Sequence, residues 1–297
     1  MLGNIELFCH TAELASFTKA AARAAVTQAA VSRAVSRLEA QFGVQLLVRS
    51  TRSVRLTERG RTFYEQCRQA LHMLADAERE LSGDQQETSG TVRLSLPTSY
   101  GHCRVLPILA DFMQAHPRIK LDIQLSNRNA DLIADGFDLA IRARVPADSG
   151  LIACKLEEAP LLMAASPAYL RRHGMPQSLD DLARHRCIGF ERPRTGQLVP
   201  WLVLEEGAVR EITPEPVLLI SDDIQGVPRA AMHGLGICQT YRFMVEDQLR
   251  AGLLAEVLPA HGGATRPFSL LYPGQRHMPR RVRVLIDYLL ARLRDQI

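Results

Sequence analysis

The stretch "AVTQAAVSRAVSRLEAQFG", residues 25–43, decides how the first part of the chain folds. At 100° per residue, Val31, Val35, Leu38 and Phe42 fall in one narrow arc, which predicts the buried face of a helix. The opposite side carries short side chains and arginines, so the helix can approach a partner closely and donate paired hydrogen bonds to guanine. We therefore predict a helix that enters the major groove of DNA. The residues expected to face the DNA are Thr27, Gln28, Ala29, Ser32, Arg33, Ser36 and Arg37.

The segment before this helix supports that interpretation. Ser16 precedes "FTKAA" and Thr27 precedes Gln28, and both hydroxyls suit the N-cap of a helix. Two capped helices separated by a short turn are typical of a helix-turn-helix, here at about 17–36. The alternative, a surface helix whose arginines are simply solvated, fits an isolated amphipathic helix better than this arrangement.

The next segment, "LLVRSTRSVRLTERG" at 46–60, begins apolar and then becomes turn-rich and basic. We expect a strand-like hairpin in which Arg49 and Arg52 neutralise DNA phosphates without reading the sequence. Residues 1–60 hold eight Lys or Arg and four Asp or Glu, a net charge of +4, which equals that of the whole chain. A small basic N-terminal unit indicates a polyanionic partner. We predict a winged helix-turn-helix domain over 1–60.

A long helix is predicted over 58–82. Its apolar residues are spaced 4, 3, 4, 3 and 4 apart, as in the a and d positions of a heptad repeat. The helix would be about 36 Å long, so we expect its seam to pair with a second copy of the chain. Packing against its own chain is the alternative. The residues of this dimerisation seam are Phe63, Cys67, Ala70, Leu74, Ala77 and Leu81.

Residues 83–90 are polar and glycine-containing, which predicts a hinge. From residue 91 to 297, strand-like and helix-like segments alternate. "TVRLSLP" (91–97), "IKLDIQLS" (119–126) and "DLAIRAR" (138–144) are predicted strands. This alternation predicts an α/β domain with a parallel sheet covered by helices.

Composition excludes several classes. The longest uncharged apolar runs fall short of the roughly 20 residues of a membrane-spanning helix, and the N-terminus does not look like a signal peptide. We therefore expect a cytoplasmic protein without a membrane partner. The six cysteines and nine histidines show no metal-binding spacing. We predict no metal and no cofactor.

The chain resembles the LysR-type transcriptional regulators over essentially its full length. "SFTKAA", "TQAAVSRAVSRLE" and "FGVQLLVRSTRSVRLTERG" carry the resemblance in the first part, and "HPRIKLDI", "DGFDLAIR" and "GLGI" carry it in the second. Ala25 and Val48 are smaller than the leucine and phenylalanine that are common in the family at these places.

The resemblance implies a winged helix-turn-helix, a dimerising linker helix and a two-lobed α/β effector domain similar to periplasmic solute-binding proteins. Lobe I would comprise 91–160 and 266–297, and lobe II 161–265. The implied function is transcription regulation that responds to a small-molecule effector. The implied partners are double-stranded DNA, the effector, further copies in a homodimer or homotetramer, and RNA polymerase.

An effector site is expected between the lobes, since ligands of open α/β sheets bind beyond the carboxyl ends of the strands. Hydroxyls at a helix start together with one arginine favour a small organic acid or another anion. Three alternatives stay open: Ser99 as a mere N-cap, Arg142 paired with Asp222, and Trp201 as a core residue. The candidate residues are Thr98, Ser99, Ser126, Asn127 and Arg142 from lobe I, and Trp201, Asp222 and Tyr241 from lobe II.

Two other functions are open to a chain of this kind. In a thiol-based redox-sensing regulator, Cys103 near a helix N-terminus would be favoured as a thiolate. However, the segment 197–207, where the peroxide sensors of the family carry a reactive cysteine, has none. An enzyme is not expected, because "GLGIC" lacks the full G-x-G-x-x-G pattern of a nucleotide loop.

Overall fold

The computed structural model describes residues 1–49, 54–81, 88–128, 132, 135–143, 150–193, 195–274 and 278–294. The chain forms two compact units, and each is described by itself. The first is the N-terminal part, 1–87, and the second contains almost all of the rest. No helix in the described ranges is long and apolar enough to cross a membrane.

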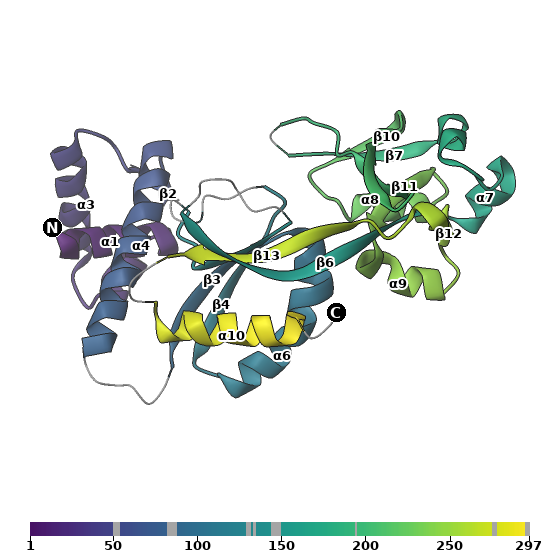
Figure 1. Ribbon diagram of the computed structural model, residues 1–297. Helices are drawn as coiled ribbons and strands as arrows, with labels where there is room; N and C mark the ends of the chain where they lie inside the picture. The colour runs from purple at the N-terminus through teal and green to yellow at the C-terminus, as the bar shows by residue number, and fades with distance from the viewer. Residues whose placement is uncertain are drawn as a thin grey trace. The chain divides into compact units, whose positions relative to one another are not determined.

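Three helices build the N-terminal head, α1 (Leu2–Leu14), α2 (Phe17–Arg23) and α3 (Gln28–Phe42) (Figure 1). The two predicted caps are confirmed: Ser16 Oγ accepts from Lys19 N at 3.3 Å, and Thr27 Oγ1 accepts from Ala30 N at 3.2 Å. Gly43 ends α3 in the left-handed conformation, with φ +66°. Local caps therefore define both ends of α3.

The buried face of α3 is close to the predicted one. Val31, Val35 and Leu38 are fully buried. The prediction was wrong for Phe42, which is 43% exposed and packs its ring 5.1 Å from that of Phe63. Phe42 is the last residue of α3, where the helix extends past the head core, so helical periodicity alone overestimated its burial.

A hairpin and a long helix complete the head. β1 (Leu47–Arg49) pairs antiparallel with β2 (Val54–Leu56), and α4 covers Glu58–Leu81. Thr57 Oγ1 accepts from Gly60 N at 2.9 Å, so a side-chain cap starts α4 as well.

The second unit is built on one nine-stranded sheet in the order β10-β7-β11-β6-β13-β5-β3-β4, with β12 also paired to β6; β8 and β9 form a separate hairpin. The strands are β3 (Gly90–Leu96), β4 (Ile119–Leu125), β5 (Leu139–Arg142), β6 (Leu151–Ala165), β7 (Cys187–Glu191), β8 (Trp201–Glu205), β9 (Ala208–Ile212), β10 (Pro216–Ser221), β11 (Ile237–Tyr241), β12 (Ala255–Val257) and β13 (Thr265–Pro273). The helical segments are α5 (Thr98–Tyr100), the π-helical turn η1 (Gly101–Val105), α6 (Leu106–Ala115), α7 (Pro167–His173), η2 (Leu179–Arg184), α8 (Gly226–Met232), α9 (Arg242–Arg250), η3 (Pro259–His261) and α10 (Arg280–Arg294).

The sheet is mixed rather than parallel. β3 pairs parallel with β4 and β5, and β7 with β10 and β11, as the alternating pattern predicted. The two long strands β6 and β13 are antiparallel to each other and to their other neighbours. Figure 1 shows them running together from the β3–β4 end of the unit to the β7–β11 end. They therefore connect two lobes, and their antiparallel direction did not follow from the alternation of elements.

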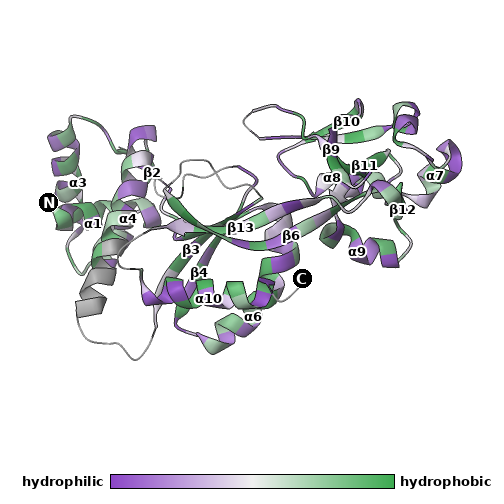
Figure 2. Ribbon diagram, viewed as in Figure 1, coloured by the Kyte–Doolittle hydropathy of each residue, from purple (hydrophilic) through white to green (hydrophobic). Residues whose placement is uncertain are grey.

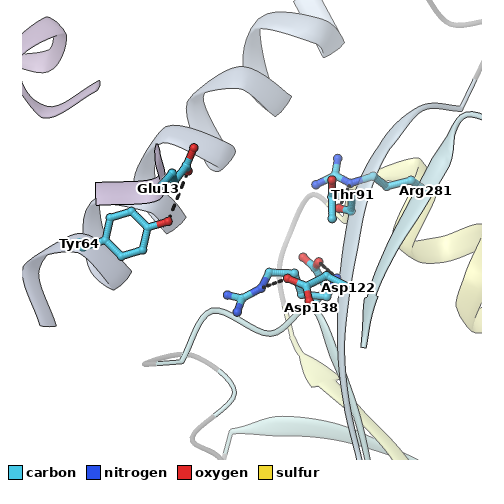
Figure 3. Close-up of polar contacts among 7 residues, drawn as sticks. Glu13, Tyr64, Thr91, Asp122, Asp138 and Arg281 are labelled. Atoms are coloured by element: carbon cyan, nitrogen blue, oxygen red, sulfur yellow. Dashed lines mark hydrogen bonds and ion pairs between the residues drawn. The ribbon is translucent and has the colours of Figure 1, made fainter. Parts of the chain in front are cut away.

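Buried residues form clusters in both lobes, and the cluster of lobe I extends to Tyr241 of β11 in lobe II. In lobe I, buried residues of β3, α6 and α10 form one cluster, and α10 alternates hydrophobic and hydrophilic residues along its length (Figure 2). In lobe II, two further clusters lie around β7 and β11. Polar contacts fix the start of β3: Arg281 Nε donates to the Thr91 carbonyl at 2.9 Å, and Asp122 and Asp138 accept hydrogen bonds from Arg93 (Figure 3).

Candidate DNA-binding and effector sites

The outer face of α3 presents the predicted groove residues to solvent. Thr27, Gln28, Ala29, Arg33, Ser36 and Arg37 are exposed, and Ser32 is half-buried. The buried side of the same helix is held by the head core. This face therefore combines two accessible guanidinium groups with short neighbours, which suits a helix that approaches base edges.

The helices behind α3 are tied together by polar contacts. Glu13 of α1 pairs with Arg23 of α2 at 2.9 Å, and Tyr64 of α4 donates to Glu13 at 3.4 Å (Figure 3). One carboxylate thus joins three helices. These contacts hold the scaffold that supports α3.

The wing is anchored to α3 by a residue that sequence reasoning missed. Glu39 Oε1 accepts from the backbone N–H groups of Leu46 and Leu47 at 2.9 and 3.1 Å. Gly60 allows a close approach here, because a Cβ on it would lie 1.9 Å from the Leu46 carbonyl oxygen. The sequence did contain a signal for this contact. Glu39 is a glutamate near the end of a helix whose outer face otherwise carries short side chains and arginines.

The predicted phosphate contacts are only partly described. The side chain of Arg49 and the whole of Arg52 lie outside the described residues. Arg55 of β2 is exposed. The Arg55 side chain is therefore accessible to a partner.

The predicted dimer seam divides into two parts. Phe63 and Cys67 pack into the head core around Phe8, so the alternative of packing against the same chain applies to this end. Ala70 is exposed, and Leu74 is 44% exposed. The side chains of Ala77 and Leu81 lie outside the described residues.

At the candidate effector site, Asn127 connects the lobes. Its Oδ1 accepts from Thr98 N at 3.1 Å, and its Nδ2 donates to Thr98 Oγ1 at 2.9 Å and to the Asp222 carbonyl at 2.8 Å. The backbone N–H of Thr98 is therefore occupied by Asn127 and is not open to a ligand. Moreover, α5 is a single short turn.

Arg142 is the most distinctive residue of the site. It is 7% exposed; Nη1 donates to the Ser95 and Ile141 carbonyls at 3.0 and 2.7 Å, and Nη2 donates to Ser95 Oγ at 2.8 Å. Pairing with Asp222 is thus wrong. Within the described ranges no carboxylate forms an ion pair with Arg142. Burial lowers its pKa to about 10.

The other candidates differ in exposure. Ser99 is buried inside α5, whose N-cap is Pro97, so Ser99 is not a cap. Ser126 is half-buried, and its Oγ accepts from Arg128 N at 3.2 Å.

The two aromatic candidates are packed. Trp201 lies in the lobe II core, as its alternative reading expected. Tyr241 stacks on Phe243 with ring centroids 5.1 Å apart, and burial raises its pKa to about 12.

The thiols give no support to a redox sensor. Burial raises the pKa of Cys9 and Cys238 to about 12 and that of Cys187 to about 11, and it also raises the pKa of Cys67 and Cys103. Cys103 lies within η1 rather than at an open helix N-terminus, so the expected thiolate preference was wrong.

Two family models match the chain. "Bacterial regulatory helix-turn-helix protein, lysR family" matches residues 2–61, and "LysR substrate binding domain" matches residues 85–294. The chain is 35% identical to the uncharacterized HTH-type transcriptional regulator YhjC of Escherichia coli K12, over 99% of this chain and 98% of that protein. It is 32% identical to the HTH-type transcriptional regulator CrgA of Neisseria meningitidis serogroup C, over 99% and 97%.

Solved structures agree with these matches. The structure of CrgA from Neisseria meningitidis has a TM-score of 0.63 at 31% identity and covers 98% of each chain. The full-length structure of the Vibrio cholerae virulence activator AphB, a member of the LTTR protein family, has a TM-score of 0.65 at 28% identity, and the match covers 99% of each chain.

Proposed function

This chain belongs to the LysR family of bacterial transcriptional regulators, with a DNA-binding head and an effector-binding domain, and we propose that its effector is an anion bound by Arg142. The buried guanidinium of Arg142 carries the proposal. Its described partners are two carbonyls and one hydroxyl, which are neutral. A buried cation without a counter-charge is costly, and a small carboxylate or similar anion would remove that cost.

Polar residues that follow the ends of β3 and β4 would orient the anion. Thr98 Oγ1 accepts from Asn127 and, in the described part of the chain, has no acceptor for its own hydrogen, which it can donate to a ligand. Ser126 lies beside Asn127 in the chain and completes the direct contacts, while Asp222 supports the site through its backbone carbonyl, which accepts from Asn127. Ser99, Trp201 and Tyr241 are buried in packing, so we assign them to the wall that supports the site.

Effector binding would act through the angle between the lobes. The Asn127–Asp222 contact joins lobe I to lobe II, so an anion bound next to it favours one lobe arrangement over another. Regulators of this family bind DNA and oligomerise, and a change of lobe angle in a homotetramer alters the spacing of its DNA-binding heads. The operator is then an imperfect inverted repeat with half-sites about one helical turn apart.

On the DNA, we assign base reading to Arg33 and Arg37, supported by Thr27, Gln28, Ala29, Ser32 and Ser36. Arg49 and Arg52 of the wing contact phosphates. RNA polymerase is a further partner at the promoter. A regulator of chromosomal DNA acts in the cytoplasm, where we place this one.

The effector proposal is tested by thermal unfolding of the full-length protein with a panel of small carboxylates and their neutral amides. A ligand at about 100 times its Kd stabilises the protein by about 2.7 kcal/mol. We expect a carboxylate, but not its amide, to raise the Tm of the wild type and of the Arg210→Gln control, whose arginine is exposed. Arg142→Gln should abolish the shift. Equal shifts with the amide, or an unchanged shift in Arg142→Gln, would contradict the proposal.

Genome-wide mapping of the DNA that the protein binds would identify its operators and point to candidate effectors. Fragments recovered in this way should contain the inverted repeat, and the neighbouring genes define which carboxylates enter the panel. Binding without any shared repeat would reject sequence-specific recognition.

A further inference from the structure

A second group of side chains joins the lobes at the middle of β6, and it contains none of the proposed effector contacts. We call Tyr100, Arg104, Glu157 and Phe243 the hinge cluster. Glu157 lies on β6 opposite Phe268 of β13, where the pairing register shifts by one residue. A register shift of this kind bends a strand locally, so Glu157 sits where the two connecting strands pass from one lobe to the other.

The cluster contains residues from both lobes. Tyr100 of α5 and Arg104 of η1 belong to lobe I, whereas Phe243 of α9 belongs to lobe II. The rings of Tyr100 and Phe243 meet edge to face with centroids 6.0 Å apart, and the Arg104 guanidinium lies 5.1 Å from the Phe243 ring centroid. A change in lobe angle must therefore alter the surroundings of Glu157.

Hydrogen bonding in the cluster is incomplete. Glu157 is 5% exposed and Tyr100 is fully buried. Among the described residues, neither Glu157 Oε1 nor the Tyr100 hydroxyl has a hydrogen-bond partner. Glu157 Oε2 lies 3.5 Å from Arg104 Nε, farther than in a strong charge-assisted hydrogen bond. Native proteins seldom leave buried polar atoms unpaired, and such atoms mark strained or functional places.

When Glu157 is ionised, the charges and hydrogen bonds around it do not offset the cost of burying its carboxylate. Burial is the largest effect and raises the pKa of Glu157, and the charge of Arg104 acts in the opposite direction without cancelling it. Burial also raises the pKa of Tyr100, so its hydroxyl stays protonated. The other charged groups around β6 have contacts elsewhere: Lys155 with Glu158 at 2.6 Å, Arg242 with Glu256 at 2.9 Å, Arg266 with the Pro200 carbonyl at 2.8 Å, and Arg294 with the Lys155 carbonyl at 3.0 Å.

We propose that Glu157 is a proton-dependent hinge residue: the lobe arrangement in which Tyr100 and Arg104 pack on Phe243 holds a proton on Glu157. An arrangement that separates these residues exposes the carboxyl to water and releases the proton to solvent. Acid therefore favours the packed arrangement, and alkali favours the separated one. The inference concerns the lobes alone and holds whatever the effector is.

The direction of the pH effect follows from the linkage between proton binding by Glu157 and the equilibrium of the two lobe arrangements. A carboxyl whose pKa is raised in one arrangement stabilises that arrangement fully below its ordinary value of 4.5, and this stabilisation is lost as the pH rises through the raised pKa. For each unit by which the pKa of Glu157 differs between the two lobe arrangements, the ratio of their populations changes by up to about tenfold.

The test is hydrogen–deuterium exchange of the full-length protein without effector, read by mass spectrometry over η1 and α9. The wild type is compared with Glu157→Gln, which mimics the protonated acid, at pH 5.5 and at pH 8.5. Glu158→Gln is the matched control, because Glu158 is the next residue of β6 but is exposed. Comparing variants at one pH removes the intrinsic pH dependence of exchange.

We expect the wild type and Glu157→Gln to differ less in exchange rate at pH 5.5 than at pH 8.5. At pH 8.5, η1 and α9 of the wild type should exchange several-fold faster than those of Glu157→Gln, and Glu158→Gln should follow the wild type. Equal exchange of wild type and Glu157→Gln at both pH values would overturn the proposal, as would the same protection in Glu158→Gln.

Arg104→Gln provides a second, independent measurement if Glu157→Gln does not fold. Without the charge of Arg104, Glu157 should hold its proton to a higher pH. The pH at which η1 and α9 lose protection should then rise relative to the wild type. A midpoint that stays in place or falls would reject Glu157 as the titrating group.

Discussion

Glu39 Oε1 lies 2.9 Å from the backbone nitrogen of Leu46, and this contact ties the recognition helix to the first strand of the wing. The same oxygen accepts from Leu47 N, so one carboxylate satisfies two backbone donors at the start of β1. The contact thereby joins the face of α3 that we propose to read bases to the hairpin that we propose to contact phosphates. We expect sequence-specific binding to depend on this contact, because in our proposal both elements meet the same stretch of DNA.

Replacing Glu39 by alanine should loosen the wing. Two charge-assisted hydrogen bonds are lost, and we expect the free energy of unfolding to fall by about 1–3 kcal/mol. Affinity should fall for operator and random DNA alike. Chemical denaturation and DNA-binding titrations measure the two effects, and Glu39→Gln, which keeps an acceptor oxygen, should lose less. If Glu39→Ala unfolded at the same denaturant concentration as the wild type, the contact would not be what holds the wing.

Arg33 and Arg55 test the division between base reading and phosphate contact, since each substitution by alanine removes one exposed guanidinium. Arg33→Ala should abolish preference for the operator while most affinity for random DNA remains. Arg55→Ala should weaken binding to every sequence and reduce the slope of log K against log salt by about one. Fluorescence anisotropy at several salt concentrations distinguishes the two. The same loss of specificity in both variants would refute the assignment.

Gly60 should not tolerate a side chain. An alanine Cβ there meets the Leu46 carbonyl oxygen at 1.9 Å, and backbone cannot give way cheaply. We expect Gly60→Ala to lower the free energy of unfolding by at least about 1–3 kcal/mol, the typical cost of overpacking. Gly3→Ala is the control, since nothing lies within 4 Å of the added Cβ and alanine favours a helix. Thermal unfolding should therefore show opposite shifts; two shifts of the same sign would be inconsistent with the close approach.

Leu74→Asp should dissociate dimers. Leu74 is an exposed leucine on α4, beyond the part of the predicted seam that packs into the head. A charge on this seam must be desolvated when two helices pair. Analytical ultracentrifugation should report a lower mass for Leu74→Asp, whereas Thr62→Asp, an exposed position off the seam of the same helix, should keep the wild-type mass. An undiminished mass for Leu74→Asp would place the dimer contact elsewhere.

Much of the head could be predicted because its signals are local. Caps at Ser16 and Thr27 and the periodicity of Val31, Val35 and Leu38 involve residues only a few positions apart, and these expectations are confirmed. Phe42 shows the limit of helical periodicity as a predictor of burial. A residue at the end of a helix is buried only if another element covers it. Likewise, the heptad spacing of α4 did not reveal that Phe63 and Cys67 serve the head core.

In the effector-binding domain, the sequence by itself determined which segments become strands and helices and which polar residues end the first strands. Tertiary structure alone decided the partners of those residues. Asn127 meets the carbonyl of Asp222, 95 positions away, and Arg142 meets Ser95 rather than a carboxylate. The burial of Glu157 likewise depends on antiparallel strands and on helices from both lobes. Short-range rules determine local conformation, but contacts and desolvation depend on neighbours that only the folded chain brings together.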